Sequence, residues 1–137
     1  MESQGRVARQ ESDANAPQPF ALASRTEGSW TVIDVRGDLD VYSSPTLRQL
    51  ILDRIHRGHG KIIVDLEHVD FLDSAGASVM VSALRQAANR NGTLALVQPG
   101  DQARRMLRLT DLDKVLRTFT SVEDAVNKGL PGMGAET

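Results

Sequence analysis

Residues 61–66, which read Lys-Ile-Ile-Val-Asp-Leu, form a short and nearly continuous apolar run rich in β-branched side chains. A run of this kind is typical of a strand covered on both faces, so we expect a central strand of a parallel sheet. A helix is expected from about Ser74 to Asn89, where apolar residues repeat at helical spacing until Asn91-Gly92. Its predicted buried stripe consists of Val79, Met80, Ala83, Leu84 and Ala87.

The sequence before this strand predicts a hairpin and a helix. Residues 20–23 and 30–35 are strand-like and flank the turn signal Glu27-Gly28-Ser29, which predicts an opening antiparallel hairpin. Gly37 is expected to stop its second strand. Ser44 is predicted to cap the next helix because a proline follows it in the first turn. The apolar positions of that helix are Leu47, Leu50, Ile51 and Ile55.

The remaining sequence continues the alternation of strands and helices. Residues 93–97 are the next predicted strand, and Asp101 is expected to cap a third helix. Residues 115–120 are read as a last strand, after which Ser121 opens a last helix. The order predicts a single α/β domain with a mixed sheet of about four to five strands packed against about four helices.

The two ends of the chain have few large apolar side chains. Residues 1–18 and residues 130–137 therefore cannot offset the entropy lost on ordering, and we expect a disordered arm and a flexible tail. The globular domain is predicted to span residues 19–129.

Composition excludes several classes of function. The 137 residues carry a formal net charge of −2 and no cysteine. That charge gives no broad attraction to nucleic acid or to an anionic membrane, and without cysteine neither a disulfide framework nor a thiolate metal site is possible. The N-terminus lacks the apolar region of a signal peptide, and no apolar run is long enough to span a bilayer. Cytoplasmic residence is the expectation that follows.

The most informative stretch is Val69 to Gly76, which leads from the central strand into the second helix. Partners of open α/β sheets are met where strands end and helices begin. The hydroxyl of Ser74 is expected to satisfy a free amide of the first helical turn, while Gly76 permits a close approach. Taken alone, these residues are read first as a helix cap.

A second stripe on this helix is expected to face solvent. It is separate from the predicted buried stripe and has the residues Ser74, Ala77, Ser78, Val81 and Arg85 at spacings of three and four. A small and partly apolar surface of this kind suits docking of a helix or loop from another protein.

Two segments are informative together, Phe71-Leu72-Asp73-Ser74-Ala75-Gly76 and Val35-Arg36-Gly37-Asp38-Leu39-Asp40. Through this pair the sequence resembles the STAS family, named for sulphate transporters and anti-sigma factor antagonists. The resemblance spans nearly the whole globular part. It includes the helix from Ser44 to Ile55, the strand from Ile62 to Leu66 and the segment from Ala103 to Leu109.

The resemblance implies a switch without catalysis by this chain. It implies that the unmodified protein binds an anti-sigma factor that is also a serine kinase, which releases a sigma factor. The kinase would phosphorylate Ser74 and abolish binding, and a phosphatase would reverse the change. Ala75 departs from many relatives, which carry Ser or Thr there. The expected partner surface consists of Asp38, Asp40, Asp73, Ser74, Ala75, Gly76, Ala77, Ser78, Val81 and Arg85.

Other interpretations of these residues fit less well. Without the resemblance, Asp38 and Asp40 are read as parts of a polar turn. A receiver domain phosphorylated on aspartate lacks a correctly placed acidic pair and lysine, and serine hydrolysis lacks the nucleophile elbow. The histidines have no third ligand of suitable spacing, so neither metal nor cofactor is expected. Trp30 and Phe71 are expected in the core. A non-switching STAS scaffold or transporter-accessory subunit remains the alternative.

Overall fold

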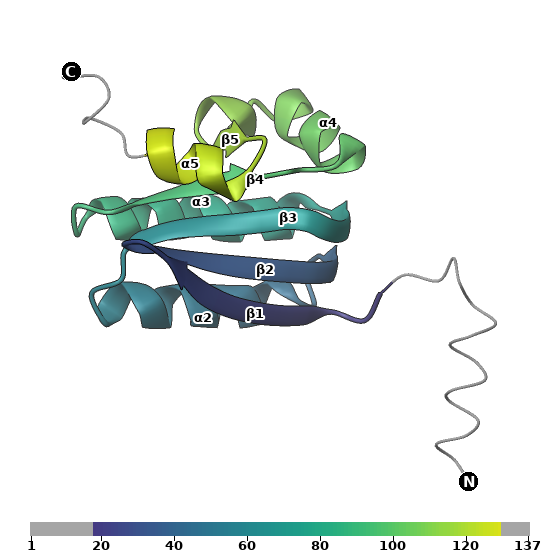
Figure 1. Cartoon of the computed structure of the whole chain (residues 1–137). Helices are drawn as coiled ribbons and strands as arrows, with labels where there is room; N and C mark the ends of the chain where they lie inside the picture. Colours follow the sequence, from purple (N-terminus) through teal and green to yellow (C-terminus); the bar gives the residue numbers. More distant parts are fainter. Residues whose placement is uncertain (1–17, 130–137) are drawn as a thin grey trace, which may run out of the picture.

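The computed structural model describes residues 18–129, so the expected arm before Gln18 and the expected tail lie outside the described residues. The elements are, in chain order, β1 (Ala21–Glu27), β2 (Trp30–Leu39), α2 (Ser44–His56), β3 (Lys61–Leu72), α3 (Ser74–Ala88), β4 (Thr93–Val97), α4 (Asp101–Leu109), a 3-10 turn (Leu112–Lys114), β5 (Arg117–Phe119) and α5 (Val122–Lys128). They form one five-stranded sheet in the order β1-β2-β3-β4-β5 (Figure 1). β1 is antiparallel to β2, and all other neighbours are parallel. The predicted mixed sheet with an opening hairpin is confirmed.

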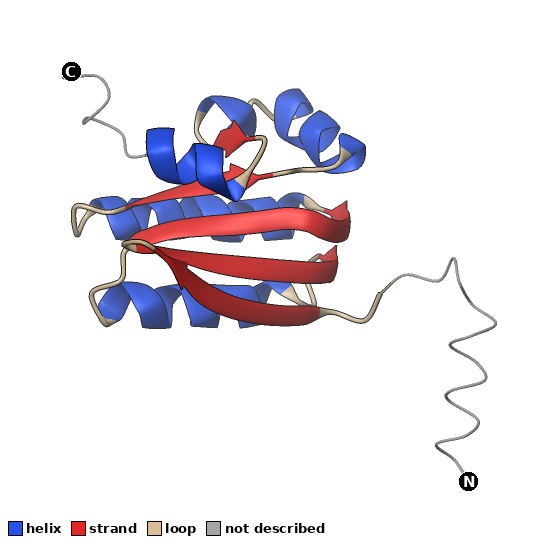
Figure 2. Cartoon of the chain, viewed as in Figure 1, coloured by secondary structure: helices blue, strands red, loops and turns tan. Residues whose placement is uncertain are grey.

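The helices cover the two faces of the sheet unequally (Figure 2). Helices α2 and α3 pack on one face, where Ile51 and Met80 meet Val64 in the larger apolar cluster. Helix α5 lies on the other face, where Ala125 packs with Trp30 in a smaller cluster. The predicted burial of Trp30 and of the central strand is confirmed, since Trp30 is 3% exposed and Val64 is fully buried.

Both central strands run further than the sequence predicted. Gly37 does not stop β2. It has a φ of 89° at an irregularity between Gly37 and Asp38, and the pairing with β3 continues beyond it. A Cβ at Gly37 would lie 2.8 Å from Gln18 O and 3.0 Å from Phe20 Cα. Glycine is therefore needed where the segment before β1 crosses β2, and the two strands continue to Leu39 and Leu72.

Two of the predicted helix caps are wrong. Ser44 is the buried first residue of α2, and the residue before it, Ser43, holds the N-cap position. Likewise, Asp101 is the first residue of α4, which follows Gly100. In both cases the N-cap residue lies one position before the expected one. The predicted cap at Ser121 is confirmed, because its hydroxyl accepts a hydrogen bond from Asp124 N.

The buried stripe of α3 is narrower than predicted. Met80, Ala83 and Ala87 are buried, whereas Val79 and Leu84 are only half-buried at its margins. The half-buried pair still packs against the larger cluster. Across residues 18–129, no helix is both long enough and apolar enough to cross a bilayer.

Candidate functional site

The candidate site lies where β2 and β3 end. The strand register pairs Leu39 with Leu72, and Asp73 N donates a hydrogen bond to Leu39 O over 3.2 Å. Segments 35–40 and 71–76 are therefore side by side at the carboxyl ends of two parallel strands. Partners of open α/β sheets are met at this edge.

Asp73, and not Ser74, caps helix α3. Asp73 has an extended backbone, and its Oδ1 accepts a hydrogen bond from Gly76 N over 3.0 Å. The expectation that the Ser74 hydroxyl serves as the cap is wrong, because the cap lies one residue earlier. Ser74 is the exposed first residue of the helix. Within residues 18–129 its hydroxyl makes no hydrogen bond, because the cap contact is made by Asp73.

Gly76 holds the first turn of α3 tightly against the end of β2. A Cβ at this position would lie 2.6 Å from Leu39 O and 2.9 Å from Leu72 Cδ1. The close approach predicted for Gly76 therefore occurs inside the domain. Gly76 is buried, so its assignment to the partner surface is wrong.

The loop after β2 is built around Asp40. Its Oδ1 accepts hydrogen bonds from Tyr42 N over 3.0 Å and from Ser43 N over 3.1 Å. The Ser43 hydroxyl in turn donates to Asp38 O over 2.7 Å. The expectation of a polar turn thus describes Asp40 well. Asp38 lies in β2 itself and is half-buried, which corrects its predicted place in the loop.

Three large apolar side chains are exposed around this edge. Val41 is 57% exposed, Tyr42 is 89% exposed and Phe71 is 45% exposed. Phe71 was expected in the core, and that expectation is wrong because Leu72 takes the inward position. Adjacent residues of a strand point to opposite faces, so the length of β3 was the signal that could have placed Phe71 outside.

A groove of about 400 Å³ adjoins Tyr42. Its lining combines two carboxylates with hydroxyl, amide and apolar groups, and consists of Gln18, Phe20, Asp38, Asp40, Tyr42, Ser43 and Thr46. The loop after β2 therefore presents an acidic, partly apolar hollow next to its exposed tyrosine.

Comparison with known proteins agrees with this geometry. Residues 21–125 match the family model of the STAS domain. The chain belongs to the STAS domain family. Its similar relatives include the anti-sigma-F factor antagonist RsfB of Mycobacterium tuberculosis, which is 24% identical over 112 residues, 82% of this chain and 91% of the relative. The anti-sigma-B factor antagonist of Staphylococcus aureus is 26% identical over 102 residues, 74% of this chain and 94% of the relative.

Solved structures share the same STAS fold. An anti-sigma factor antagonist from Mycobacterium paratuberculosis superposes with a TM-score of 0.73 at 26% identity, covering 82% of this chain and 95% of that chain. SpoIIAA in its unphosphorylated form superposes with a TM-score of 0.67 at 23% identity, covering 80% of this chain and 95% of that chain. The resemblance noted in the sequence is therefore confirmed for family and fold.

The exposed face of α3 in this STAS domain differs from the predicted stripe. Ser74, Ser78 and Arg85 are exposed, and Val81 is half-buried. Ala77 is fully buried in the larger apolar cluster. It lies at the edge of the predicted stripe, three residues before the buried Met80. Ala77 is thus removed from the expected partner surface. Ala75, half-buried beside Ser74, stays on it.

The other acidic residues of β3 do not form a metal site. Nowhere in the described part of the STAS domain do three or more His, Asp or Glu side chains gather closely enough to hold an ion. Asp65 lies further back along β3, beside Asp34 of β2. Its pKa is raised by burial and, to a smaller extent, by the charges of Asp34 and Glu67, against a hydrogen bond from Glu67 N.

Proposed function

We propose that this STAS domain is an anti-sigma factor antagonist whose binding is switched off by phosphorylation of Ser74. In this proposal it binds an anti-sigma factor with serine kinase activity in the cytoplasm and thereby releases a sigma factor. A phosphatase acting on phosphorylated Ser74 restores binding. The domain is a ligand and a substrate, not a catalyst, and needs no cofactor. The observation that carries the proposal is the exposed, unbonded hydroxyl of Ser74 at the docking edge.

The domain itself should tolerate a phosphate at Ser74. The group would sit at the N-terminus of α3, a helix of 15 residues, where free amides and the helix dipole favour an anion. Asp73 already uses the Gly76 amide, but the earlier amides of the first turn remain available. Phosphorylation should therefore leave the fold intact.

A bound partner should not tolerate the same phosphate. The group adds about −1.5 to −2 charge at pH 7. A partner that covers Ser74 and Ala75 would have to desolvate that charge next to Asp73, and any acidic group opposite would be repelled. Binding is then lost without a change of conformation in the antagonist.

The exposed apolar residues supply the contact area that the predicted stripe lacks. Val41 and Tyr42 project from the loop after β2, and Phe71 projects from the end of β3. Aromatic residues at the centre of an interface commonly contribute most of its binding energy. We therefore assign the main docking contacts to these residues and the switch to Ser74.

Recovery of a partner from native lysate, followed by binding with the purified partner, tests this function. The unmodified protein should retain an anti-sigma factor that, given ATP, adds one phosphate to the intact mass at Ser74. Ser74→Asp should weaken the complex by about tenfold, or about 1.4 kcal/mol, and genuine phosphoserine by more. Ser74→Ala should still bind without becoming phosphorylated. Equal binding of the phosphorylated and unmodified protein would contradict the switch and leave a non-switching STAS scaffold or transporter-accessory subunit.

A further inference from the structure

Gln102, in the first turn of α4, is hydrogen-bonded to Leu72, which lies two residues before Ser74. Its side-chain amide accepts a hydrogen bond from Leu72 N and donates one to Leu72 O, each over 2.8 Å. Leu72 is the last residue of β3, and Asp73 and Ser74 follow it. One side chain therefore fixes both polar backbone groups of a residue, as a neighbouring strand would.

This pair of hydrogen bonds replaces a strand that has ended. The pairing of β3 with β4 stops at Asp65 and Val97, whereas its pairing with β2 continues to Leu72. Successive residues of a strand direct their amide and carbonyl groups to opposite sides. Asp73 N uses the β2 side, so Leu72 presents both groups to the side that β4 has left.

The reacting group and the two exposed apolar residues of the loop after β2, Val41 and Tyr42, are held by different parts of the structure. The position of Ser74 depends on Leu72, because the cap residue Asp73 directly joins them. The position of Tyr42 depends instead on the turn built around Asp40. A change at Gln102 should therefore move the Ser74 hydroxyl and leave the contacts of the loop after β2 in place.

We propose that Gln102 is a positioning residue for the phosphorylation of Ser74, an inference that rests on the proposed function. Gln102 acts through Leu72. A displacement of roughly 1 Å at a reacting group can lower turnover by about 100-fold even when the change lies outside the reacting atoms. Capture of the protein by its kinase also draws on Val41 and Tyr42, which Gln102 does not hold, and should change much less than turnover.

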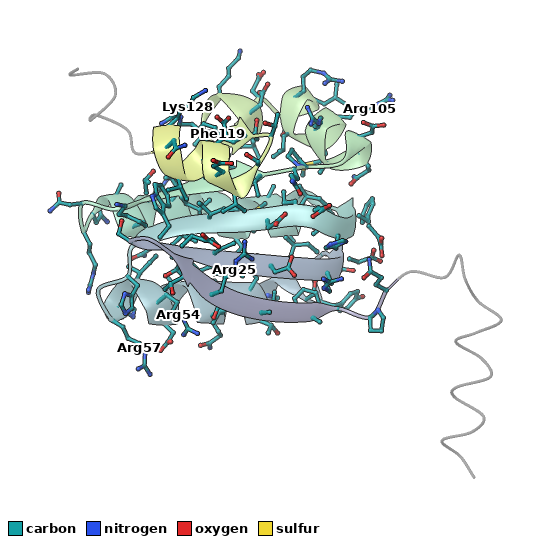
Figure 3. The ribbon with its side chains drawn as sticks, viewed as in Figure 1. Arg25, Arg54, Arg57, Arg105, Phe119 and Lys128 are labelled. Carbon is teal, nitrogen blue, oxygen red and sulfur yellow. The ribbon has the colours of Figure 1, made fainter. Side chains whose placement is uncertain are left out.

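The test replaces Gln102 by methionine, which has a similar length and no amide. With the anti-sigma factor purified from the lysate experiment as the kinase, Gln102→Met should lower kcat for Ser74 phosphorylation by about tenfold or more, while KM changes by less than about twofold. A role confined to stability would leave kcat unchanged well below the unfolding transition. Arg105→Ala is the matched control, because Arg105 is an exposed residue of the same helix (Figure 3), and it should behave as the unaltered protein.

Hydrogen exchange of the Leu72 amide gives a second measurement that needs no partner. This amide should be protected in the unaltered protein and should exchange about tenfold faster or more in Gln102→Met, while the Val64 amide is unaffected. If Gln102→Met does not fold, Gln102→Glu keeps the acceptor for Leu72 N and loses the donor for Leu72 O, and the same fall in kcat is expected.

Three results would overturn the inference. They are an unaltered kcat in a folded variant, rapid exchange of the Leu72 amide in the unaltered protein, and equal loss of kcat in Arg105→Ala. Absence of Ser74 phosphorylation in the unaltered protein is a separate result, which overturns the proposed function and this inference with it.

Discussion

Replacing Asp73 and Ser74 one at a time should separate the cap of α3 from the phosphorylation site. Asp73→Ala removes the hydrogen bond of 3.0 Å to Gly76 N and a negative charge at the positive end of a helix of 15 residues. The free energy of unfolding should fall by about 1 to 2 kcal/mol. Ser74→Ala removes an exposed hydroxyl without a partner in residues 18–129 and adds a better helix former, so the change should stay within about 0.5 kcal/mol.

Urea and thermal unfolding measure this difference. A loss of 1 kcal/mol corresponds to a fall of about 4 °C in Tm for a domain of this size. We expect Asp73→Ala to lose at least that much, with an unchanged m-value, and Ser74→Ala to unfold with the unaltered protein. Ser78→Ala, on the same exposed face one turn later, is the control. A loss in Ser74→Ala equal to that in Asp73→Ala would show that the serine is the cap and that its hydroxyl is not free.

Three further predictions concern the core, the docking edge and pH. Val64→Ala should lower the free energy of unfolding by about 1.5 to 4 kcal/mol, because Val64 is fully buried. Leu84→Ala, at a half-buried position, should lower it by less than the about 2 to 5 kcal/mol typical of a core leucine. An unchanged urea midpoint for Val64→Ala would contradict the central place of Val64. Tyr42→Ala should weaken partner binding by about tenfold or more without changing stability. The control is Leu109→Ala, which removes an apolar side chain that is 72% exposed on α4 and should leave binding in calorimetry unchanged. Burial raises the pKa of Asp65, so its ionised form opposes folding; Asp65→Asn should stabilise the domain near pH 7, and unfolding curves should show this gain shrinking as the pH falls through the raised pKa.

The order of strands and helices could be predicted because each element carries its own pattern. The run at residues 61–66 is apolar at nearly every position, which only a strand buried on both faces requires. The turn at residues 27–29 likewise fixes the hairpin without long-range information. These local signals were sufficient for the fold class, whereas the family was predicted from the resemblance of the segments 35–40 and 71–76.

The docking edge could not be predicted in the same detail, because its residues depend on contacts between distant segments. Asp73 and Ser74 are both good caps, and the sequence alone does not show that Asp73 takes the N-cap position while Gly76 packs against Leu39. Similarly, Phe71 is apolar and reads as core unless β3 is known to continue past Leu66. The hydrogen bonds of Gln102 could not be predicted, because their partner, Leu72, lies 30 residues earlier in the chain.

The two ends of the described chain suit different experimental uses. Gln18 donates from its backbone to Asp70 and lines the groove beside Tyr42, whereas a Cβ at Gly129 would lie 3.3 Å from Trp30, at the start of β2. Gln18 lies against Gly37, seven residues along β2 from Trp30, a distance of about 23 Å, and Figure 1 shows the described chain leaving the sheet on opposite sides. Under the proposed function, a fluorophore, affinity tag or surface linker joined directly before Gln18 would crowd an incoming partner. The same group attached after Gly129 would leave the docking edge open, so immobilised binding assays should be anchored there.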